Sequence, residues 1–284
     1  MNSDNNNSRL NLIASEFSNE GKSRASRSRG KFWIESYPEE IELYKNMLVH
    51  RNNRILDNTT GGTNFLDIGC GFGDILYMMR HRYEVLYGID PSLDMVQQCI
   101  NNLKIRSVNN KYHITQGIAE STGLDNNLFN TIVMSDVYEH IHTSHRRKAL
   151  SEIKRILRND GQLILVTPSK LHIVIFSIID NILSIPLSIK NKSKITIFNS
   201  TPKNITEIFC TKHQLCNDLN TAGYNILKFE RVGFYPAPER PGFLGRRLIK
   251  FYYSKYYPFL KKTFTKLERI SIFNQKMLVN CVLK

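Results

Sequence analysis

The stretch NFLDIGCGFGD at residues 64–74 constrains the fold of this chain more than any other feature. Its first part, with Phe65, Leu66 and Ile68, is apolar enough for a short buried strand. An apolar helical pattern begins at Ile75, directly after the stretch. The loop between the strand and the helix carries alternating glycines: Gly69, Gly71 and Gly73. Because glycine has no Cβ atom, backbone N–H groups in such a loop can approach a ligand closely, although a tight turn without a ligand shows the same pattern.

The glycine spacing distinguishes this loop from two common phosphate-binding loops. A dinucleotide-binding turn has glycines at its first, third and sixth positions, whereas the sixth position counted from Gly69 is Asp74. A loop that cradles nucleotide phosphates ends in Gly-Lys-Ser or Gly-Lys-Thr, and this stretch contains no lysine. Asp67, two residues before the first glycine, suits a cationic ligand better than a pyrophosphate.

The same residues resemble motif I of the class I S-adenosylmethionine (SAM) dependent methyltransferases, in which an acidic residue and one further residue precede Gly-x-Gly-x-Gly. The resemblance implies that SAM is the cofactor and that its amino-acid end lies against this segment. The residues implied in this contact are Asp67, Gly69, Cys70, Gly71 and Gly73.

A second predicted strand, residues 85–89, ends at Asp90. Ligands of doubly wound sheets sit outside the carboxyl ends of the strands, so Asp90 is placed to accept hydrogen bonds from a ribose. The alternative role for Asp90 is to cap the N-terminus of the next helix. Pro91 and Ser92 open that helix, and we expect Met95 to cover the adenine face.

Residues 116–130 resemble the family's segment Gly-Asp-Ala-Glu-x-Leu-Pro-Phe, and Ala119 and Glu120 match it. Ile118 stands where the family usually has an acid that binds the adenine amine. We therefore expect backbone groups near Ala119 to recognise adenine instead.

The fourth predicted strand covers residues 131–135. The segment that follows it, residues 136–141, resembles the family's Val-Leu-Glu-His-Ile segment. Ser135 and Asp136, where this strand ends, complete the expected cofactor contacts. His140 is the best candidate for a general base, because an imidazole accepts a hydroxyl proton near neutral pH, and Glu139 beside it is the second catalytic candidate. A histidine that only pins the loop is the alternative. The sequence shows no metal-ligand spacing, so we expect metal-independent transfer.

Strands that alternate with helices predict a parallel sheet covered on both faces. Later strands are expected at residues 162–166, after a turn at 159–161, and at the end of the chain. The expected fold class is α/β, a Rossmann-like seven-stranded methyltransferase fold with helical lid insertions. The expected parts are a disordered tail (1–28), a methyltransferase core (29–233) with an apolar lid insertion (171–189), a basic aromatic insertion (234–275) and a last core strand (276–284).

The net charge of +14 is concentrated at two flanks, around residues 22–31 and 240–269. Such charge favours a membrane surface, a nucleic acid or an acidic substrate as partner, and solvated charge is the alternative. For the apolar segment 171–189 we expect a lid over the active site, with a dimer contact or an interfacial membrane helix as alternatives. The five scattered cysteines and the polar N-terminus predict a cytoplasmic protein, and the basic flanks give a peripheral position at the inner membrane face as the alternative.

Together these features predict a SAM-dependent methyltransferase that acts on an oxygen, nitrogen or carbon atom of a small or lipid-like acceptor by in-line displacement. The alternatives are an RNA methyltransferase and a SAM-binding scaffold without turnover. No Asn-Pro-Pro-Tyr-type motif follows the fourth strand, which argues against methylation of base nitrogens and makes nucleic acid the less favoured partner.

Overall fold

The computed structural model describes residues 8, 10–15, 42–175, 178, 207–234 and 274–284. Within this part the chain forms a seven-stranded sheet of order β3-β2-β1-β4-β5-β7-β6. The strands are β1 (Gly62–Ile68), β2 (Tyr83–Asp90), β3 (Lys111–Gln116), β4 (Phe129–Ser135), β5 (Leu157–Pro168), β6 (Tyr224–Phe234) and β7 (Asn274–Leu283). The first five strands are parallel, and β7 lies antiparallel between β5 and β6. The predicted seven-stranded Rossmann-like methyltransferase fold is confirmed, but the prediction of a parallel sheet needs correction, because β7 is antiparallel to both of its neighbours.

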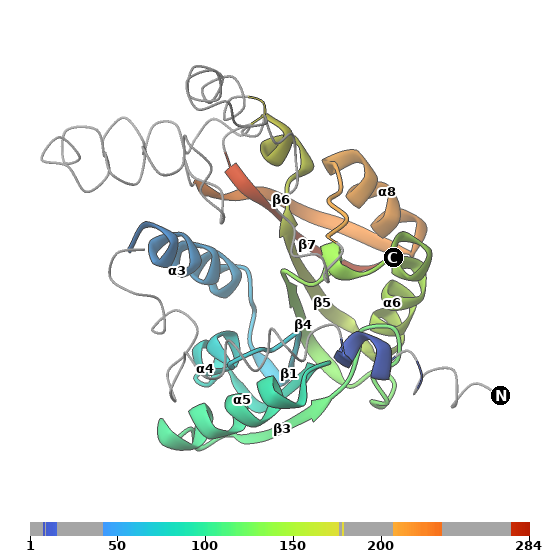
Figure 1. The fold of residues 1–284 in the computed structure, drawn as a ribbon. Coiled ribbons are helices and arrows are strands. Elements are labelled where there is room, and N and C mark those ends of the chain that lie inside the picture. Colours follow the sequence, from blue (N-terminus) through green and yellow to red (C-terminus); the bar gives the residue numbers. More distant parts are fainter. Residues whose placement is uncertain (1–7, 9, 16–41, 176–177, 179–206, 235–273) are drawn as a thin grey trace, which may run out of the picture.

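Helices cover both faces of this sheet (Figure 1). They are α3 (Glu42–Asp57), α4 (Asp74–Met79), α5 (Leu93–Ile105), the 3-10 turn η2 (Tyr138–His140), α6 (Thr143–Ile156) and α8 (Lys212–Thr221). The apolar residues of α3, α4 and α5 pack on one face, and those of α6 and α8 pack on the other. The sheet is therefore buried from both sides.

The central strands are apolar on both faces because each face has its own core. In β4, Ile132 and Met134 join the core under α6, whereas Val133 between them joins the core under α4 and α5. In β5, Leu163 and Ile164 divide in the same way. Alternating side chains of a strand point to opposite faces, so burial of both faces requires a nearly continuous apolar run.

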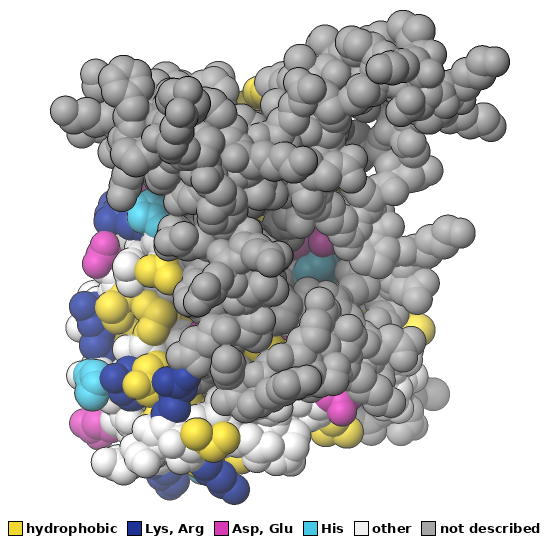
Figure 2. Space-filling model, turned by 60° about the vertical axis from the view of Figure 1, so that its left-hand side comes forward, with side chains coloured by type: hydrophobic (Ala, Val, Ile, Leu, Met, Phe, Trp, Pro, Cys, Tyr) yellow, Lys and Arg dark blue, Asp and Glu magenta, His cyan; other side chains and the backbone are white. Residues whose placement is uncertain are grey.

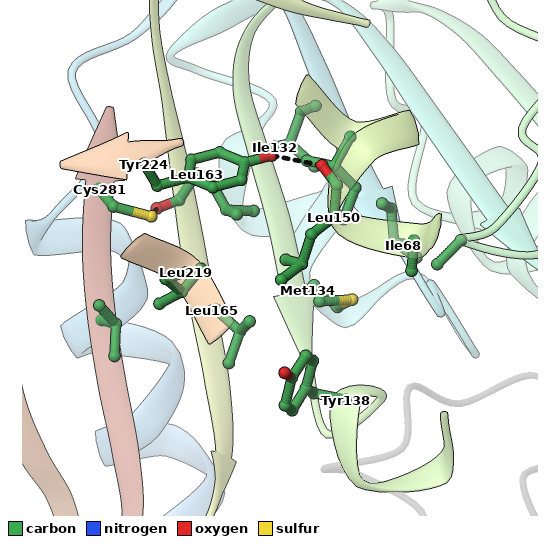
Figure 3. Close-up of a cluster of buried hydrophobic side chains, with 14 of the residues drawn as sticks. Ile68, Ile132, Met134, Tyr138, Leu150, Leu163, Leu165, Leu219, Tyr224 and Cys281 are labelled. Carbon is green, nitrogen blue, oxygen red and sulfur yellow. Dashed lines mark hydrogen bonds between the residues drawn. The ribbon is translucent and has the colours of Figure 1, made fainter. Parts of the chain in front are cut away.

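Tyr224, at the start of β6, lies in the core between the sheet and the helices α6 and α8 (Figure 3). Its ring is fully buried among the strands and α8, and its hydroxyl donates a hydrogen bond of 2.9 Å to the carbonyl oxygen of Leu150 on α6.

Replacing Tyr224 with phenylalanine is expected to lower the free energy of unfolding by about 1 kcal/mol, and replacement with alanine by about 3–5 kcal/mol. Urea unfolding measures both. Leu227→Ala, at an exposed position of the same strand, is the control and should stay within about 0.5 kcal/mol of the parent. Equal losses in Tyr224→Phe and Tyr224→Ala would show that the ring does not support this core.

Two local predictions need correction. Residues 10–15 are helical, although we expected disorder throughout residues 1–28. The expected turn at residues 159–161 is a bulge within β5, because Leu157 pairs with Phe129 and the next pair is Gln162 with Thr131. Four residues of β5 thus lie opposite one residue of β4, and the strand continues where the turn was expected.

Parts of other predictions lie outside the described residues. This applies to residues 16–41, to most of the apolar segment 171–189 and to nearly all of 234–275. The beginning of the apolar segment, residues 170–175, is helical. In the part of the chain that is described, no helix has the length and apolar character needed to span a membrane.

Candidate active site

The glycine loop between β1 and α4 is tied to the end of the neighbouring strand. The N–H groups of Gly69 and Cys70 donate to the carbonyl oxygen of Ile89 on β2, over 2.7 and 3.0 Å. Gly69, Gly71 and Gly73 have φ values of 75°, 50° and 84°, in the left-handed region that favours glycine. The strand, the loop and the helix thus form as predicted.

The glycines differ in what surrounds them. A Cβ atom added to Gly69 would lie 2.3 Å from Cγ2 of Val137, and one added to Gly73 would lie 2.8 Å from Sγ of Cys99. Among the described residues, apart from Gly71 itself and its two chain neighbours, a Cβ atom added to Gly71 would meet no atom within 4 Å. Gly69 and Gly73 are therefore required for packing, whereas Gly71 leaves an open space beside the backbone that a ligand can occupy.

Asp90 holds this loop from the end of β2. Its carboxylate accepts hydrogen bonds from the N–H groups of Gly71, over 3.0 Å, and Ser92, over 2.9 Å. The N-cap of α5 is Ser92, whose hydroxyl accepts from the N–H of Met95 over 3.4 Å. The alternative role of Asp90 as the helix cap is therefore wrong. Each carboxylate oxygen can accept more than one hydrogen bond, so Asp90 can also bind ribose hydroxyls.

The segment after β3 lies beside Asp90. The N–H of Gly117 donates to the carbonyl oxygen of Asp90 over 3.1 Å, and the side-chain amide of Gln116 donates to the carbonyl oxygen of Pro91 over 2.9 Å. The residues that follow are buried: Ile118, Ala119 and Glu120. Ala119 belongs to the same core as the ends of β1 and β2. The structure thus brings the expected adenine-side residues next to the expected ribose-binding carboxylate.

Several buried polar atoms at this end of the sheet have no hydrogen-bond partner within the described chain. They are Oδ1 of Asp67, Oγ of Ser135, Oδ1 of Asp136 and Nδ2 of Asn52. Buried polar groups are nearly always hydrogen-bonded, and exceptions call for an explanation. Asp67 and Asp136 lie near the carboxyl ends of β1 and β4, and the strand order reverses between these two strands. Ligands of doubly wound sheets bind at this switch point.

Asp67 is an acid held in an apolar setting. It is 2% exposed, and burial raises the pKa of its carboxyl well above the usual range, while the nearby Arg51 lowers it in part. A cation bound beside Oδ1 would favour the ionised carboxylate, because opposite charges stabilise each other most strongly away from water. The site therefore suits the ammonium group of a bound ligand.

Arg51 also lies at this site, although we did not predict a role for it from the sequence. It lies on α3, contacts a carboxylate oxygen of Asp136 with Nη1, and donates from Nε to Oδ1 of Asn52 over 2.9 Å. The residue spacing could have indicated this role. Arg51 follows Leu48 by three residues and precedes Ile55 by four, and so it lies on the buried face of the helix. A charge on that face requires a partner inside the fold.

Asp136 is held by two cations that come from distant parts of the chain. Its Oδ2 accepts from Nζ of Lys276 on β7 over 2.6 Å and also contacts Arg51. Burial opposes ionisation, but the charges of Lys276 and Arg51 outweigh it, so the pKa of Asp136 is lowered. Asp136 also has a φ of 58°, which is uncommon for a residue other than glycine.

The two predicted catalytic residues lie in η2, directly after Asp136. Glu139 is 3% exposed, and its Oε2 accepts a hydrogen bond of 3.0 Å from the hydroxyl of Thr167 on β5. Its backbone oxygen accepts from the N–H of Ile208 over 2.7 Å. These contacts hold η2 against β5 and residue 208, which is a structural role for Glu139. His140 is half-buried on the same turn and remains the predicted base.

Comparisons with known proteins agree with this geometry. Residues 66–165 match the family described as "Methyltransferase domain". An uncharacterized protein from Methanocaldococcus jannaschii is 30% identical over 57% of this chain and 69% of its own length. The ubiquinone/menaquinone biosynthesis C-methyltransferase UbiE from Campylobacter jejuni is 29% identical over 59% of this chain and 73% of its own. A SAM-dependent methyltransferase structure from Methanosarcina mazei superposes with a TM-score of 0.55, at 17% identity, over 81% of this chain and 98% of the other.

This chain belongs to the class I SAM-dependent methyltransferases. Its cofactor is SAM. The described residues of the methyltransferase fit that molecule on physical grounds. Asp67 offers an unpartnered carboxylate oxygen for the ammonium, Gly71 leaves space along the loop, and Asp90 offers acceptors for the ribose. Among the described residues, no group of three or more His, Cys, Asp and Glu side chains is arranged to hold a metal ion.

The methyltransferase should lose stability as the pH rises, in part because of Glu139. Burial, and then the charge of Asp136, raise the pKa of Glu139 from an ordinary 4.5 to about 8. Between these values the unfolded chain releases this proton while the folded protein keeps it, so the free energy of unfolding falls with increasing pH. Glu139→Gln removes this proton from both states. Urea unfolding at about pH 5 and about pH 8 should show a smaller loss of stability in the variant than in the parent.

Glu152 supplies a control of opposite sign. Burial opposes its ionisation, but hydrogen bonds from Arg155 and Thr122 lower the pKa of Glu152 to about 2. Its contribution is present above the ordinary pKa of a glutamate, so Glu152→Gln should destabilise the protein by a similar amount at both pH values. A Glu139→Gln variant that loses stability with pH as steeply as the parent would contradict the role given to Glu139.

Proposed function

We propose that this methyltransferase transfers the methyl group of SAM to an oxygen, nitrogen or carbon atom of a small or lipid-like acceptor. The observation that carries the proposal is the similarity to UbiE over 73% of that protein's length, since UbiE is named for C-methylation in ubiquinone and menaquinone biosynthesis. The net charge of +14 also favours an anionic surface near the acceptor.

The proposed reaction is an in-line displacement. The bond between the methyl carbon and the sulfonium of SAM breaks as a bond between that carbon and the acceptor atom forms, and the demethylated product S-adenosylhomocysteine (SAH) leaves. A proton on the acceptor atom passes to a base, for which His140 is our candidate. The sulfonium is already a good leaving group, so the protein contributes chiefly by aligning the reacting atoms, which can supply about 7–11 kcal/mol.

RNA methylation is the second candidate, because of the high net charge. On the face shown in Figure 2, the coloured Lys and Arg side chains are spread among apolar and polar ones and do not form one patch. This face of the described residues therefore does not resemble an RNA-binding surface, which concentrates its cations.

Transfer of radioactive methyl groups tests the proposal. The protein is incubated with [methyl-3H]SAM and with separate lipid, small-molecule and RNA fractions of a cell extract. We expect label in the lipid or small-molecule fraction and in none of the RNA. Label that appears only in RNA and disappears on treatment with ribonuclease would favour the second candidate. Binding of SAM without label in any fraction would favour a scaffold without turnover.

A further inference from the structure

The charges around Asp136 bear on which acceptors this enzyme can use. Asp136 follows β4 directly and so lies at the switch point, beside the end of β1. Arg51 and Lys276 both contact its Oδ2, whereas Oδ1 is buried and has no hydrogen-bond partner within the described chain. A buried acceptor without a partner lowers the stability of the protein, so a group that donates to it on binding recovers that free energy.

The contacts leave Asp136 little freedom to move. Arg51 lies 85 residues before it in the sequence and Lys276 lies 140 residues after it, so three distant parts of the chain meet at one carboxylate. The left-handed backbone of Asp136, with a φ of 58°, costs energy for a residue with a Cβ atom. Backbone strain of this kind persists where the surroundings determine it and is concentrated at functional sites.

The net charge of this cluster selects among ligands. Two cations face one carboxylate, and Glu139, the neighbouring acid, keeps its proton up to about pH 8. The three groups in contact here, Arg51, Lys276 and Asp136, therefore carry a net positive charge. That charge disfavours an ammonium group at Asp136, so the ammonium of SAM is better placed at Asp67, and Asp136, which we expected among the cofactor contacts, is better suited to the acceptor. A neutral O–H group can donate a hydrogen bond to Oδ1 of Asp136. Arg51 and Lys276 would stabilise partial negative charge on the oxygen of that group.

We propose that Asp136 positions the acceptor: its Oδ1 accepts a hydrogen bond from a neutral, acidic O–H group, such as a phenol or an enol, while Arg51 and Lys276 hold Oδ2. This inference rests on the proposed function and narrows its acceptor to hydroxyl compounds that are methylated on that oxygen or on a ring carbon near it. Alkyl amines, which are cationic at neutral pH, are excluded by the same charges. Asp136 orients the acceptor and does not take its proton, because two cations make it a weak base.

Three matched probes test the acceptor class on the unmodified enzyme. They are 4-octylphenol, 4-octylanisole and 4-octylbenzylamine, which share one apolar chain and differ in the polar group. Calorimetry with SAH already bound should give dissociation constants for the anisole and the benzylamine at least about 10-fold weaker than for the phenol. Equal affinity for the phenol and the anisole would overturn the proposal, as would tighter binding of the amine.

Variants separate this role from a structural one. In Asp136→Asn we expect the affinity for 4-octylphenol to fall by about 10-fold or more, while the dissociation constant of SAM changes by less than about 3-fold. Lys276→Arg should retain more phenol affinity than Lys276→Met, because the cation on Oδ2 remains. Asp90→Asn is the matched control and should weaken SAM binding instead.

The outcomes distinguish the inference from the proposed function. If Asp136→Asn weakens SAM binding and leaves the affinity for the phenol unchanged, the inference fails, although label from SAM still enters the lipid or small-molecule fraction. If that fraction takes up no label, the proposed function itself fails. Thermal unfolding of each variant identifies those that do not fold, and the three probes on the parent enzyme decide the matter without them.

Discussion

Replacing Asp90 with alanine is expected to weaken SAM binding by about 100-fold or more. Each hydrogen bond between a charged carboxylate and a ribose hydroxyl contributes about 1.5–3 kcal/mol, and two of them are lost. The substitution also releases the N–H groups of Gly71 and Ser92, which Asp90 holds at 3.0 and 2.9 Å. The glycine loop then loses its connection to the start of α5. Isothermal titration calorimetry with SAM and SAH measures the effect.

Two further variants show whether the carboxylate itself is responsible. Asp90→Asn keeps the shape of the side chain but loses the charge and one acceptor, so its loss of affinity should lie between those of the parent and Asp90→Ala. Asp94→Ala, in the first turn of α5, removes a partly exposed carboxylate close by and should leave SAM binding within about 2-fold. Unchanged SAM affinity in Asp90→Ala would refute the assignment of the ribose site.

Gly71→Ala is expected to abolish detectable SAM binding while the protein stays folded. The added methyl group would enter the open space beside the loop, where no atom of the described residues beyond the adjoining ones lies within 4 Å, and so would occupy the position of the ligand. The left-handed φ of 50° adds a cost of about 1–2 kcal/mol to folding. For a protein of this size that corresponds to a fall in melting temperature of only several degrees.

Gly69→Ala is the matched comparison. Both positions have a positive φ, but a Cβ atom at Gly69 would lie 2.3 Å from the side chain of Val137, so this variant should lose much more stability than Gly71→Ala. Circular dichroism melts and calorimetry with SAM measure stability and binding separately. A Gly71→Ala variant that binds SAM as tightly as the parent would show that the open space is not the cofactor site.

Most of the elements that carry the expected cofactor site could be predicted from local sequence. The loop after β1, the carboxylate at the end of β2 and the strand before Ser135 each depend on residues within a few positions of one another. Glycine spacing reports backbone conformation directly, and an acid at the end of an apolar run reports the carboxyl edge of a sheet. Both patterns can be interpreted without knowledge of the fold, because each describes the backbone geometry of a few neighbouring residues.

The acceptor side could not be predicted in the same way. Nothing near Asp136 in the sequence indicates that Arg51 and Lys276 contact it, because they lie 85 and 140 residues away. Lys276 arrives there because β7 runs antiparallel to β5, which pairs its first residues with the end of that strand, Pro168 with Lys276. A lysine at the start of an apolar strand is equally compatible with a solvent-exposed position.

The sequence by itself determined that β1 to β4 and the core of β5 are strands of one sheet, with a glycine loop at the end of β1 and an acid at the end of β2, since periodicity and glycine spacing act over short distances. Only the tertiary structure decided which charges surround Asp136. That outcome depends on strand order and on the packing of α3 against the sheet, and both are settled by burial of apolar surface across the whole domain rather than by neighbouring residues.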